Sequence, residues 1–254
     1  MKKVITIFIV SLLAGQAMAK DDFDFSAECT NGQTLYYKIT SNTEPYSVMV
    51  TYPKYKMDDS HDIYYYYKYD EPKGDLIIPE TVTYKGKTYS VSSIRNNTFY
   101  YCDGLTSVTI PQSVKSIGRS AFCRCYNLTT VNIPNSVTEI GSFLFSGCEK
   151  LTSITIPNGV TTIDIIAFIE LESLTSITIP NSVTVIEDEA FTGCYSLTSI
   201  TIGNSVTSIG NGAFYYCSSL DTVTCLAMTP PALGRDVFDE CDNPTLFVPC
   251  GALE

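Results

Sequence analysis

The chain is dominated by a motif that returns every 23 residues from about residue 76 onward. Its leucines stand at Leu105, Leu128, Leu151, Leu174, Leu197 and Leu220, and its phenylalanines at Phe99, Phe122, Phe145, Phe168, Phe191 and Phe214. A fixed period of this length is typical of a solenoid, in which each repeat forms one coil and stacked coils share a hydrophobic core. The repeat therefore predicts an elongated stack of about seven coils spaced by about 4.8 Å.

The spacing inside one repeat predicts the shape of a coil. Val108 and Ile110 are two residues apart, which indicates a short strand with alternate side chains pointing inward. Pro111 has no amide proton and is expected to end that strand. Val114 and Ile117 then place two more apolar side chains inside. The step Ala-Phe-x-x-Cys closes the coil, and we expect it to form a short helical turn.

The cysteines follow the same period. Five of the ten share one repeat position, namely Cys102, Cys125, Cys148, Cys194 and Cys217, and Cys241 lies one residue out of phase. Ten cysteines in an exported chain would suggest disulfides. The equivalent slot in the coil 151–173 holds Leu171, however, so the slot is apolar and buried reduced thiols are favoured. Strained bridges between neighbouring coils stay open, as does a pair between Cys225 and Cys250 near the C-terminus.

The first residues have the pattern of a secretory signal peptide. Lys2 and Lys3 precede the apolar stretch 4–14, and Ala17-Met18-Ala19 is an A-x-A cleavage site. The alternative is a membrane anchor, which the short apolar run disfavours. We expect residues 1–19 to be removed, which leaves no integral membrane segment. The mature protein is then secreted, periplasmic or held at the cell surface.

The region between the signal peptide and the solenoid contains no repeat. Residues 33–40 and 46–52 alternate polar and apolar side chains, which predicts strands. We expect residues 20–75 to form a small Tyr-rich β cap, and residues 76–254 to form the repeat domain with irregular first and last coils. In the first coil, an insertion at residues 80–89 predicts a hairpin that turns at Lys85-Gly86.

The unit L-x-x-[VI]-x-I-P-x-S-V-x-x-I-G-x-x-A-F-x-x-C resembles the BspA-like leucine-rich repeats, also described as the Treponema pallidum-type class. The likeness covers about 180 residues of the chain and recurs in register. The resemblance implies a right-handed superhelix with a parallel β-sheet on its concave side. It also implies surface-exposed or secreted proteins, some of which adhere to host matrix proteins or other cells. The predicted fold class is thus an α/β leucine-rich-repeat solenoid with short helical turns on its convex side and an N-terminal β cap.

Features that would indicate catalysis or nucleic-acid binding are missing from the sequence. The one histidine, His61, lies in an acidic stretch, where a solvated loop is more common than a metal site. No phosphate-binding loop, dinucleotide motif, zinc-protease motif or nucleophile elbow is present. The formal net charge of −11 disfavours nucleic acid, which needs a basic face. We therefore expect no enzyme, no cofactor and no metal.

Two surfaces remain for function. The first is the outward face of the predicted sheet, whose candidate contact residues are Thr109, Asn132, Thr155, Thr178, Thr201 and Thr224. Small hydroxyls there also serve strand propensity and solubility. The second surface is the aromatic run Tyr64, Tyr65, Tyr66 and Tyr67 in the cap. These rings either pack on the cap or form a contact patch, since Tyr is favoured at interfaces.

Two functions fit these surfaces. The first is adhesion or protein binding, through the sheet face or the Tyr-rich cap, to an extracellular partner such as a host matrix protein or another cell surface. The second is a carbohydrate-associated or structural role at the cell surface. The fold alone does not choose between them, because function depends on the variable surface.

Overall fold

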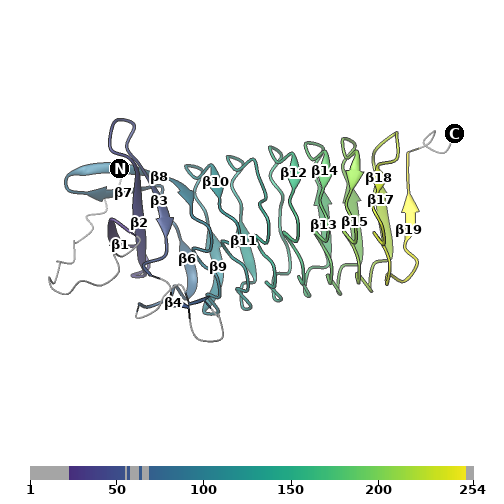
Figure 1. Ribbon diagram of the computed structural model, residues 1–254, viewed down its shortest axis with the longest axis horizontal. Helices are drawn as coiled ribbons and strands as arrows, with labels where there is room; N and C mark the ends of the chain where they lie inside the picture. Colours follow the sequence, from purple (N-terminus) through teal and green to yellow (C-terminus); the bar gives the residue numbers. More distant parts are fainter. Residues whose placement is uncertain (1–22, 55, 58–62, 65–68, 250–254) are drawn as a thin grey trace.

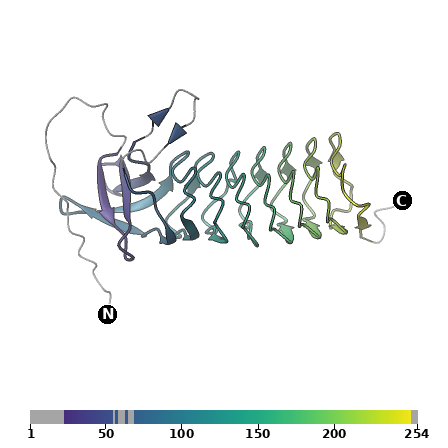
Figure 2. The same cartoon turned by 90° about the horizontal axis from the view of Figure 1, so that it is seen from below.

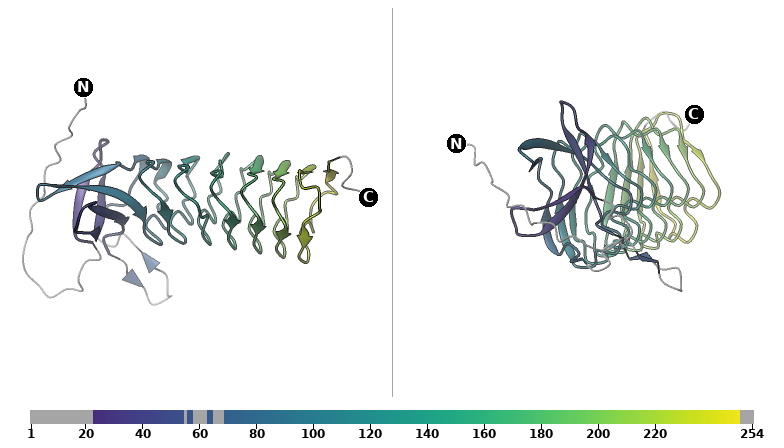
Figure 3. Two further views of the ribbon diagram at one scale, coloured as in Figure 1. Left: turned by 90° about the horizontal axis from the view of Figure 1, so that it is seen from above. Right: turned by 60° about the vertical axis from the view of Figure 1, so that its left-hand side comes forward.

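The protein forms an elongated rod of stacked coils with a β region at its N-terminal end (Figure 1). The computed structural model describes residues 23–54, 56–57, 63–64 and 69–249. Figure 2 shows the coils following one another along the rod, and in the oblique view of Figure 3 their outlines nearly repeat one another. The predicted solenoid is confirmed. The predicted signal peptide lies outside the described residues and stays a prediction.

The Leu-x-x-Ile-x-Ile step of the coils forms a parallel sheet, here called the first sheet. Its strands are β6 (Gly74–Ile77), β9 (Leu105–Thr109) and β11 (Thr130–Asn132) in one part, and β13 (Ser176–Ile179), β15 (Ser199–Ile202), β17 (Thr222–Cys225) and β19 (Thr245–Phe247) in the other. Partners are one period apart, as in Val108 opposite Val131. The parallel pairing was predicted, but the equivalent residues of the coil 151–173 form no strand, so the sheet is divided there.

A second parallel sheet runs along the rod at the isoleucine that follows the Pro turn. It contains β12 (Thr162–Ile163), β14 (Val185–Ile186), β16 (Ser208–Ile209) and β18 (Ala232–Leu233), while β10 (Ser116–Ile117) pairs with a strand of the N-terminal region. Ile140 joins this row through an isolated bridge to Ile163. The repeat predicts that these side chains are buried, but the second sheet was not predicted.

The predicted helical turns are wrong, because no helix occurs in the described ranges. From the second sheet the chain returns to the first through a series of turns, here called the return segment of each coil (residues 118–127 in the second coil). Ser120 and Arg124 there have φ of 54° and 60°, whereas an α-helix needs φ near −60° throughout. The N–H groups alternate in direction. Phe122 donates to Leu144 of the next coil at 3.1 Å, and Cys123 donates back to Ser120 at 3.2 Å.

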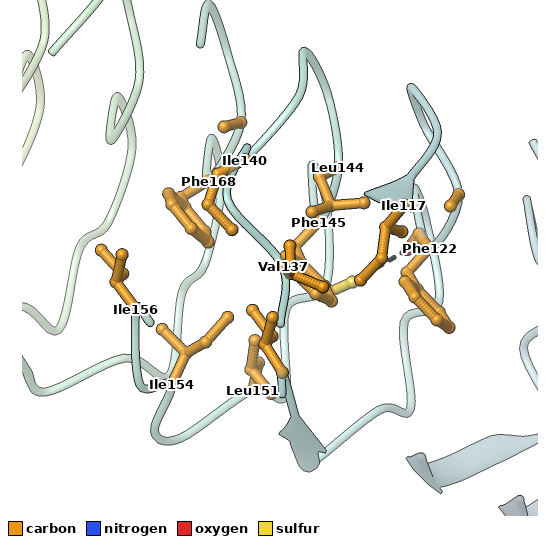
Figure 4. Packing of buried hydrophobic residues seen from close by; sticks show 14 of the residues in the cluster. Ile117, Phe122, Val137, Ile140, Leu144, Phe145, Leu151, Ile154, Ile156 and Phe168 are labelled. Carbon is orange, nitrogen blue, oxygen red and sulfur yellow. Dashed lines mark hydrogen bonds between the residues drawn. The ribbon is translucent and has the colours of Figure 1, made fainter. Parts of the chain in front are cut away.

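The core of the rod consists of columns of equivalent side chains. The ring of each repeat phenylalanine stacks on the next, with centroids 5.1 to 6.0 Å apart and interplanar angles of 5 to 15° from Phe99 to Phe214. Figure 4 shows three of these rings, Phe122, Phe145 and Phe168, among leucine, isoleucine and valine side chains of the same coils. All six rings are fully buried. Each coil thus buries its apolar face against its two neighbours.

The cysteine column lies in this core as free thiols, which confirms the sequence prediction. From the second coil onward, each cysteine thiol of this column donates a hydrogen bond to the carbonyl oxygen of a repeat phenylalanine in the preceding coil. Cys125 and Cys148 donate at 3.1 Å to Phe99 and Phe122, and Cys194, Cys217 and Cys241 do so at 3.3 Å. This bond explains why Cys is preferred over Leu in the slot. Cys250 lies outside the described residues, so the possible pair with Cys225 stays open.

The N-terminal region covers the first coil with a mixed sheet. Its order is β1 (Phe25–Glu28), β2 (Thr34–Ser41), β3 (Ser47–Thr51), β8 (Lys87–Ile94) and β10, and β7 (Thr81–Tyr84) pairs with β8. The two predicted strands correspond to β2 and β3. The predicted hairpin is β7–β8, and Lys85 and Gly86 at its tip have φ of 49° and 74°, as a type I′ turn requires. A short antiparallel pair, β4 (Lys56–Met57) and β5 (Ile63–Tyr64), forms a separate two-stranded sheet.

Candidate functional site

The outward positions of the first sheet form two parallel columns of side chains along the rod. One column contains the predicted contact residues Thr109, Asn132, Thr155, Thr178, Thr201 and Thr224, of which the first four are exposed and the last two half-buried. The strand register holds Thr178, Thr201 and Thr224 directly side by side. Thr155 lies in the coil without a strand, so it is exposed but outside the ladder of the sheet. The structure thus brings most of this predicted set together.

The ends of this column are apolar, and the two residues there were not predicted as contact residues. Ile77 pairs with Thr109 at the N-terminal end and is 47% exposed. Phe247 pairs with Thr224 at the other end and is 54% exposed. The sheet face is therefore a run of hydroxyl and amide groups with one large apolar side chain at each end. The irregular end coils hid both residues, because there the motif is degenerate.

The second column begins with a carboxylate. Asp75 accepts hydrogen bonds from Ser107 Oγ at 2.6 Å and from Thr106 Oγ1 at 3.1 Å, and these bonds lower the pKa of its carboxyl. Its carbonyl oxygen accepts a bond from Gln33 Nε2 at 3.0 Å, which ties the cap to the first coils. Asp75 is the one charged side chain among the outward positions of β6, β9 and β11. The face can therefore contact a partner mainly through neutral hydrogen bonds.

The predicted aromatic patch of the cap is only partly covered by the structure. Tyr64 belongs to β5, while Tyr65, Tyr66, Tyr67 and His61 lie outside the described residues. Near this part of the chain, Phe23, Tyr36 and Tyr69 pack edge to face, with Tyr36 and Tyr69 centroids 5.5 Å apart. The patch itself stays a prediction.

A polar hollow of about 300 Å³ lies beside these rings. It is lined by Gln33, Tyr36, Asp70, Glu71 and Lys73, among others. Burial, together with Tyr69 and Asp70, raises the pKa of Tyr36 to about 12, and burial raises the pKa of the Glu71 carboxyl. Tyr36 therefore stays a neutral phenol at physiological pH. The hollow combines an aromatic ring with amide and carboxylate groups. No sequence motif predicted it.

The described residues offer little for covalent chemistry. Burial raises the pKa of the Cys29 and Cys123 thiols to about 11, so they are not thiolates at neutral pH. No group of three or more His, Cys, Asp or Glu side chains in the described part of the chain could hold a metal ion. No helix there has the length and apolarity needed to cross a bilayer.

The burial of the thiols predicts how they react. In the native protein we expect dithiobis-nitrobenzoate to label Cys241 first, because it is the one half-buried member of the described cysteines. After denaturation without reductant, all ten cysteines should react if none is paired. Two fewer would show one disulfide, and the loss of that difference in a Cys250→Ser variant would assign it to Cys250. Rapid labelling of the whole column in the native state would contradict the buried arrangement.

Solved structures with a similar fold come from bacteria. The T. pallidum leucine rich repeat protein TpLRR matches with a TM-score of 0.67 and 24% identity over 83% of this chain and 88% of that one. A leucine rich cell surface protein from Faecalibacterium prausnitzii matches with a TM-score of 0.57 and 31% identity over 80% of this chain and 55% of that one. The pneumococcal vaccine antigen PcpA matches with a TM-score of 0.61 and 22% identity over 80% of this chain and 50% of that one.

The chain thus spans about half the length of the last two proteins. No curated protein matches it. Among protein families, the BspA type leucine rich repeat region matches residues 92–221 in six copies, which is just over half of the chain. The chain therefore belongs to the BspA-type leucine-rich repeat family.

Proposed function

We propose that the protein is a non-enzymatic binding protein of the cell surface or the secreted fraction, and that it contacts another protein through the first sheet. The observation that carries the proposal is the outward column from Ile77 to Phe247, in which neutral hydrogen-bonding groups lie between two exposed apolar side chains. Such a face can contact an extended protein surface without having to desolvate charges. The similarity to a cell surface protein of F. prausnitzii supports the location.

The sheet face can be tested by adding bulk and charge to it. The double variant Thr178→Lys and Thr201→Lys places two cations opposite each other on adjacent strands. Their long charged side chains prevent a partner from approaching the face closely. We expect binding to an immobilised panel of extracellular matrix proteins to weaken at least about tenfold, which is about 1.4 kcal/mol. Stability should change by about 1 kcal/mol, because Thr178 is exposed and Thr201 is half-buried at an outward position of its strand.

A control places the same charge elsewhere. Thr184→Lys and Thr207→Lys change exposed residues close to the starts of β14 and β16 in the second sheet, and this pair should leave binding unchanged. Equal loss in both pairs would point to charge alone and would contradict the sheet face as the site. Full binding by the Thr178 and Thr201 variant would show that the site lies outside the first sheet. The Tyr64–Tyr67→Ala variant would then test the cap.

A carbohydrate-associated role is the second candidate, and the polar hollow beside Tyr36 favours it. Aromatic faces with amide and carboxylate groups suit a ligand rich in hydroxyls. The same protein should then bind immobilised polysaccharide, and Gln33→Ala with Asp70→Ala should remove this binding. Retained polysaccharide binding in that variant would exclude the hollow.

A further inference from the structure

Each return segment contains two residues in the left-handed region. The residue type at the second of these two positions differs from coil to coil. From the first coil to the last, this slot holds Tyr101, Arg124, Gly147, Glu170, Gly193, Tyr216 and Glu240. Glycine adopts such a φ without cost, whereas residues with a Cβ do so with strain. Stability alone would favour glycine at every coil, as at Gly147 and Gly193. Strained residues that persist often serve a function.

The second coil contains one such residue, Arg124, and a second arginine, Arg119, and each of the two stacks on an aromatic ring. Arg124 lies over the ring of Tyr101, with Cζ 5.2 Å from the centroid, and its Nη1 donates to Tyr101 Oη at 2.7 Å. Arg119 lies over the ring of Phe143 in the next coil, with Cζ 4.7 Å from the centroid. Both arginines are exposed. Stacking on a ring fixes the planar guanidinium in advance, so less entropy is lost when it binds.

One exposed ring, Tyr101, and the half-buried rings of Tyr126 and Phe143 lie in the same return segments as these arginines or in the adjacent ones. Tyr101 is 39% exposed, and its ring packs edge to face against Tyr126 with centroids 5.6 Å apart. Gly147 in the next coil lies against this group, since a Cβ there would be 3.3 Å from Arg124 Cγ and in ordinary contact with Tyr126 Cε1 at 3.8 Å. Arg119, Arg124, Tyr101, Tyr126 and Phe143 together are called the Arg–aromatic patch.

The charge of the chain is distributed unevenly along the rod. Residues 151–254 contain twelve acidic side chains and a single basic one, Arg235, so the whole formal charge of −11 arises there. Residues 1–150 are balanced, and three of the four arginines lie between positions 95 and 124. An anionic partner is therefore repelled from the C-terminal coils and directed toward the second coil.

We propose that the Arg–aromatic patch is a second contact surface, separate from the first sheet, which recognises an acidic segment of a partner protein. The two guanidinium groups bind carboxylates through their parallel N–H donors. The rings of Tyr101 and Tyr126 pack against the apolar side chains that flank those carboxylates. Tyr and Arg are the residue types most enriched where protein interfaces concentrate their binding energy.

The test uses the intact protein and a biotinylated peptide of alternating Glu and Leu as the probe. A peptide with Gln in place of Glu and immobilised heparin are the comparison ligands. We expect the Glu peptide to bind more tightly than the Gln peptide, and more weakly as salt is raised. The variant Arg119→Gln with Arg124→Gln should lose at least tenfold in affinity. Arg235→Gln removes one positive charge from the last coil and should bind as the wild type does.

A glycine variant separates a binding role from a structural one. Tyr101→Gly relieves the left-handed strain, so it should keep or raise the melting temperature while weakening peptide binding severalfold. A fall in both would show that Tyr101 is structural and would overturn its part in the patch. Equal binding of the Glu and Gln peptides, equal loss in the Arg235 variant, or capture by heparin alone would each overturn the proposal. The Thr178 and Thr201 lysine variant should retain peptide binding, since it changes only the first sheet.

Discussion

Replacing Phe168 with alanine is expected to lower the free energy of unfolding by about 3–5 kcal/mol. The ring is fully buried, and it stacks on Phe145 at 6.0 Å and on Phe191 at 5.1 Å. Its removal leaves a cavity in the middle of the column and takes a stacking partner from both neighbours. Each coil of a solenoid contacts only its neighbours. The substitution should therefore also weaken the cooperativity of unfolding between the coils before Phe168 and those after it.

Urea unfolding followed by circular dichroism measures both effects. The wild type is expected to unfold in one transition, and the variant earlier, in a broader or split transition. Phe238→Ala is the matched control, because that ring is half-buried and stacks on Phe214 on one side at 5.4 Å. Phe238→Ala should lower the free energy of unfolding by clearly less than Phe168→Ala does. Equal losses in the two variants would contradict the continuous column.

The interior of the rod could be predicted from the sequence because every interior position repeats. Leu151, Phe168 and the Cys slot each recur at a period of 23, and only a stacked core accounts for such a period. Free thiols could also be predicted, since Leu171 occupies in one coil the slot that holds a cysteine in the others. The hydrogen bond from Cys125 Sγ to the Phe99 carbonyl could not be foreseen, because it joins different coils.

The return segments were mispredicted as helical for a definite physical reason. An Ala-Phe pair with apolar residues three or four apart resembles one turn of an amphipathic helix. The backbone instead enters the left-handed region twice per coil, as at Phe143 and Gly147. Glycine at Gly147 and Gly193 hints at this, but Tyr101, Arg124 and Glu170 in the same slot conceal it.

The candidate surfaces were predicted unevenly for the same reason. Outward hydroxyls such as Thr178 follow from strand alternation, so their exposure could be predicted. Ile77 and Phe247 lie in degenerate end coils, and the stacking of Arg124 on Tyr101 joins residues 23 positions apart in irregular turns. Contacts of that kind depend on the conformation of the return segment, which local sequence patterns did not reveal.

Alkaline pH is expected to destabilise the protein by several kcal/mol through its buried thiols. Burial raises the pKa of Cys29 and Cys123 from 9.0 to about 11. Burial also raises the pKa of Cys102 and Cys125, and contact with the Cys194 thiol together with burial raises that of Cys217. In the unfolded chain these thiols ionise near pH 9, whereas in the native state they stay protonated.

The native state therefore holds more protons than the unfolded state between pH 9 and 11. This contribution to stability is fully present below pH 9 and is lost as the pH rises toward the native pKa values. For each thiol that stays protonated in the native state, the free energy of unfolding falls by about 1 kcal/mol per pH unit above 9. For the five thiols the loss between pH 9 and 10 is on the order of 5 kcal/mol.

Urea unfolding in the presence of reductant at pH 8, 9 and 10 measures this loss. Cys125→Leu is the matched variant, because Leu171 already fills the equivalent slot of another coil in a fully buried position. It removes one titrating group and should make the decline between pH 9 and 10 shallower by about 1 kcal/mol. A stability that stays constant from pH 8 to 10 would contradict the burial of neutral thiols. A decline equally steep in the Cys125 variant would assign it to other groups, such as the buried Tyr37, whose pKa burial also raises.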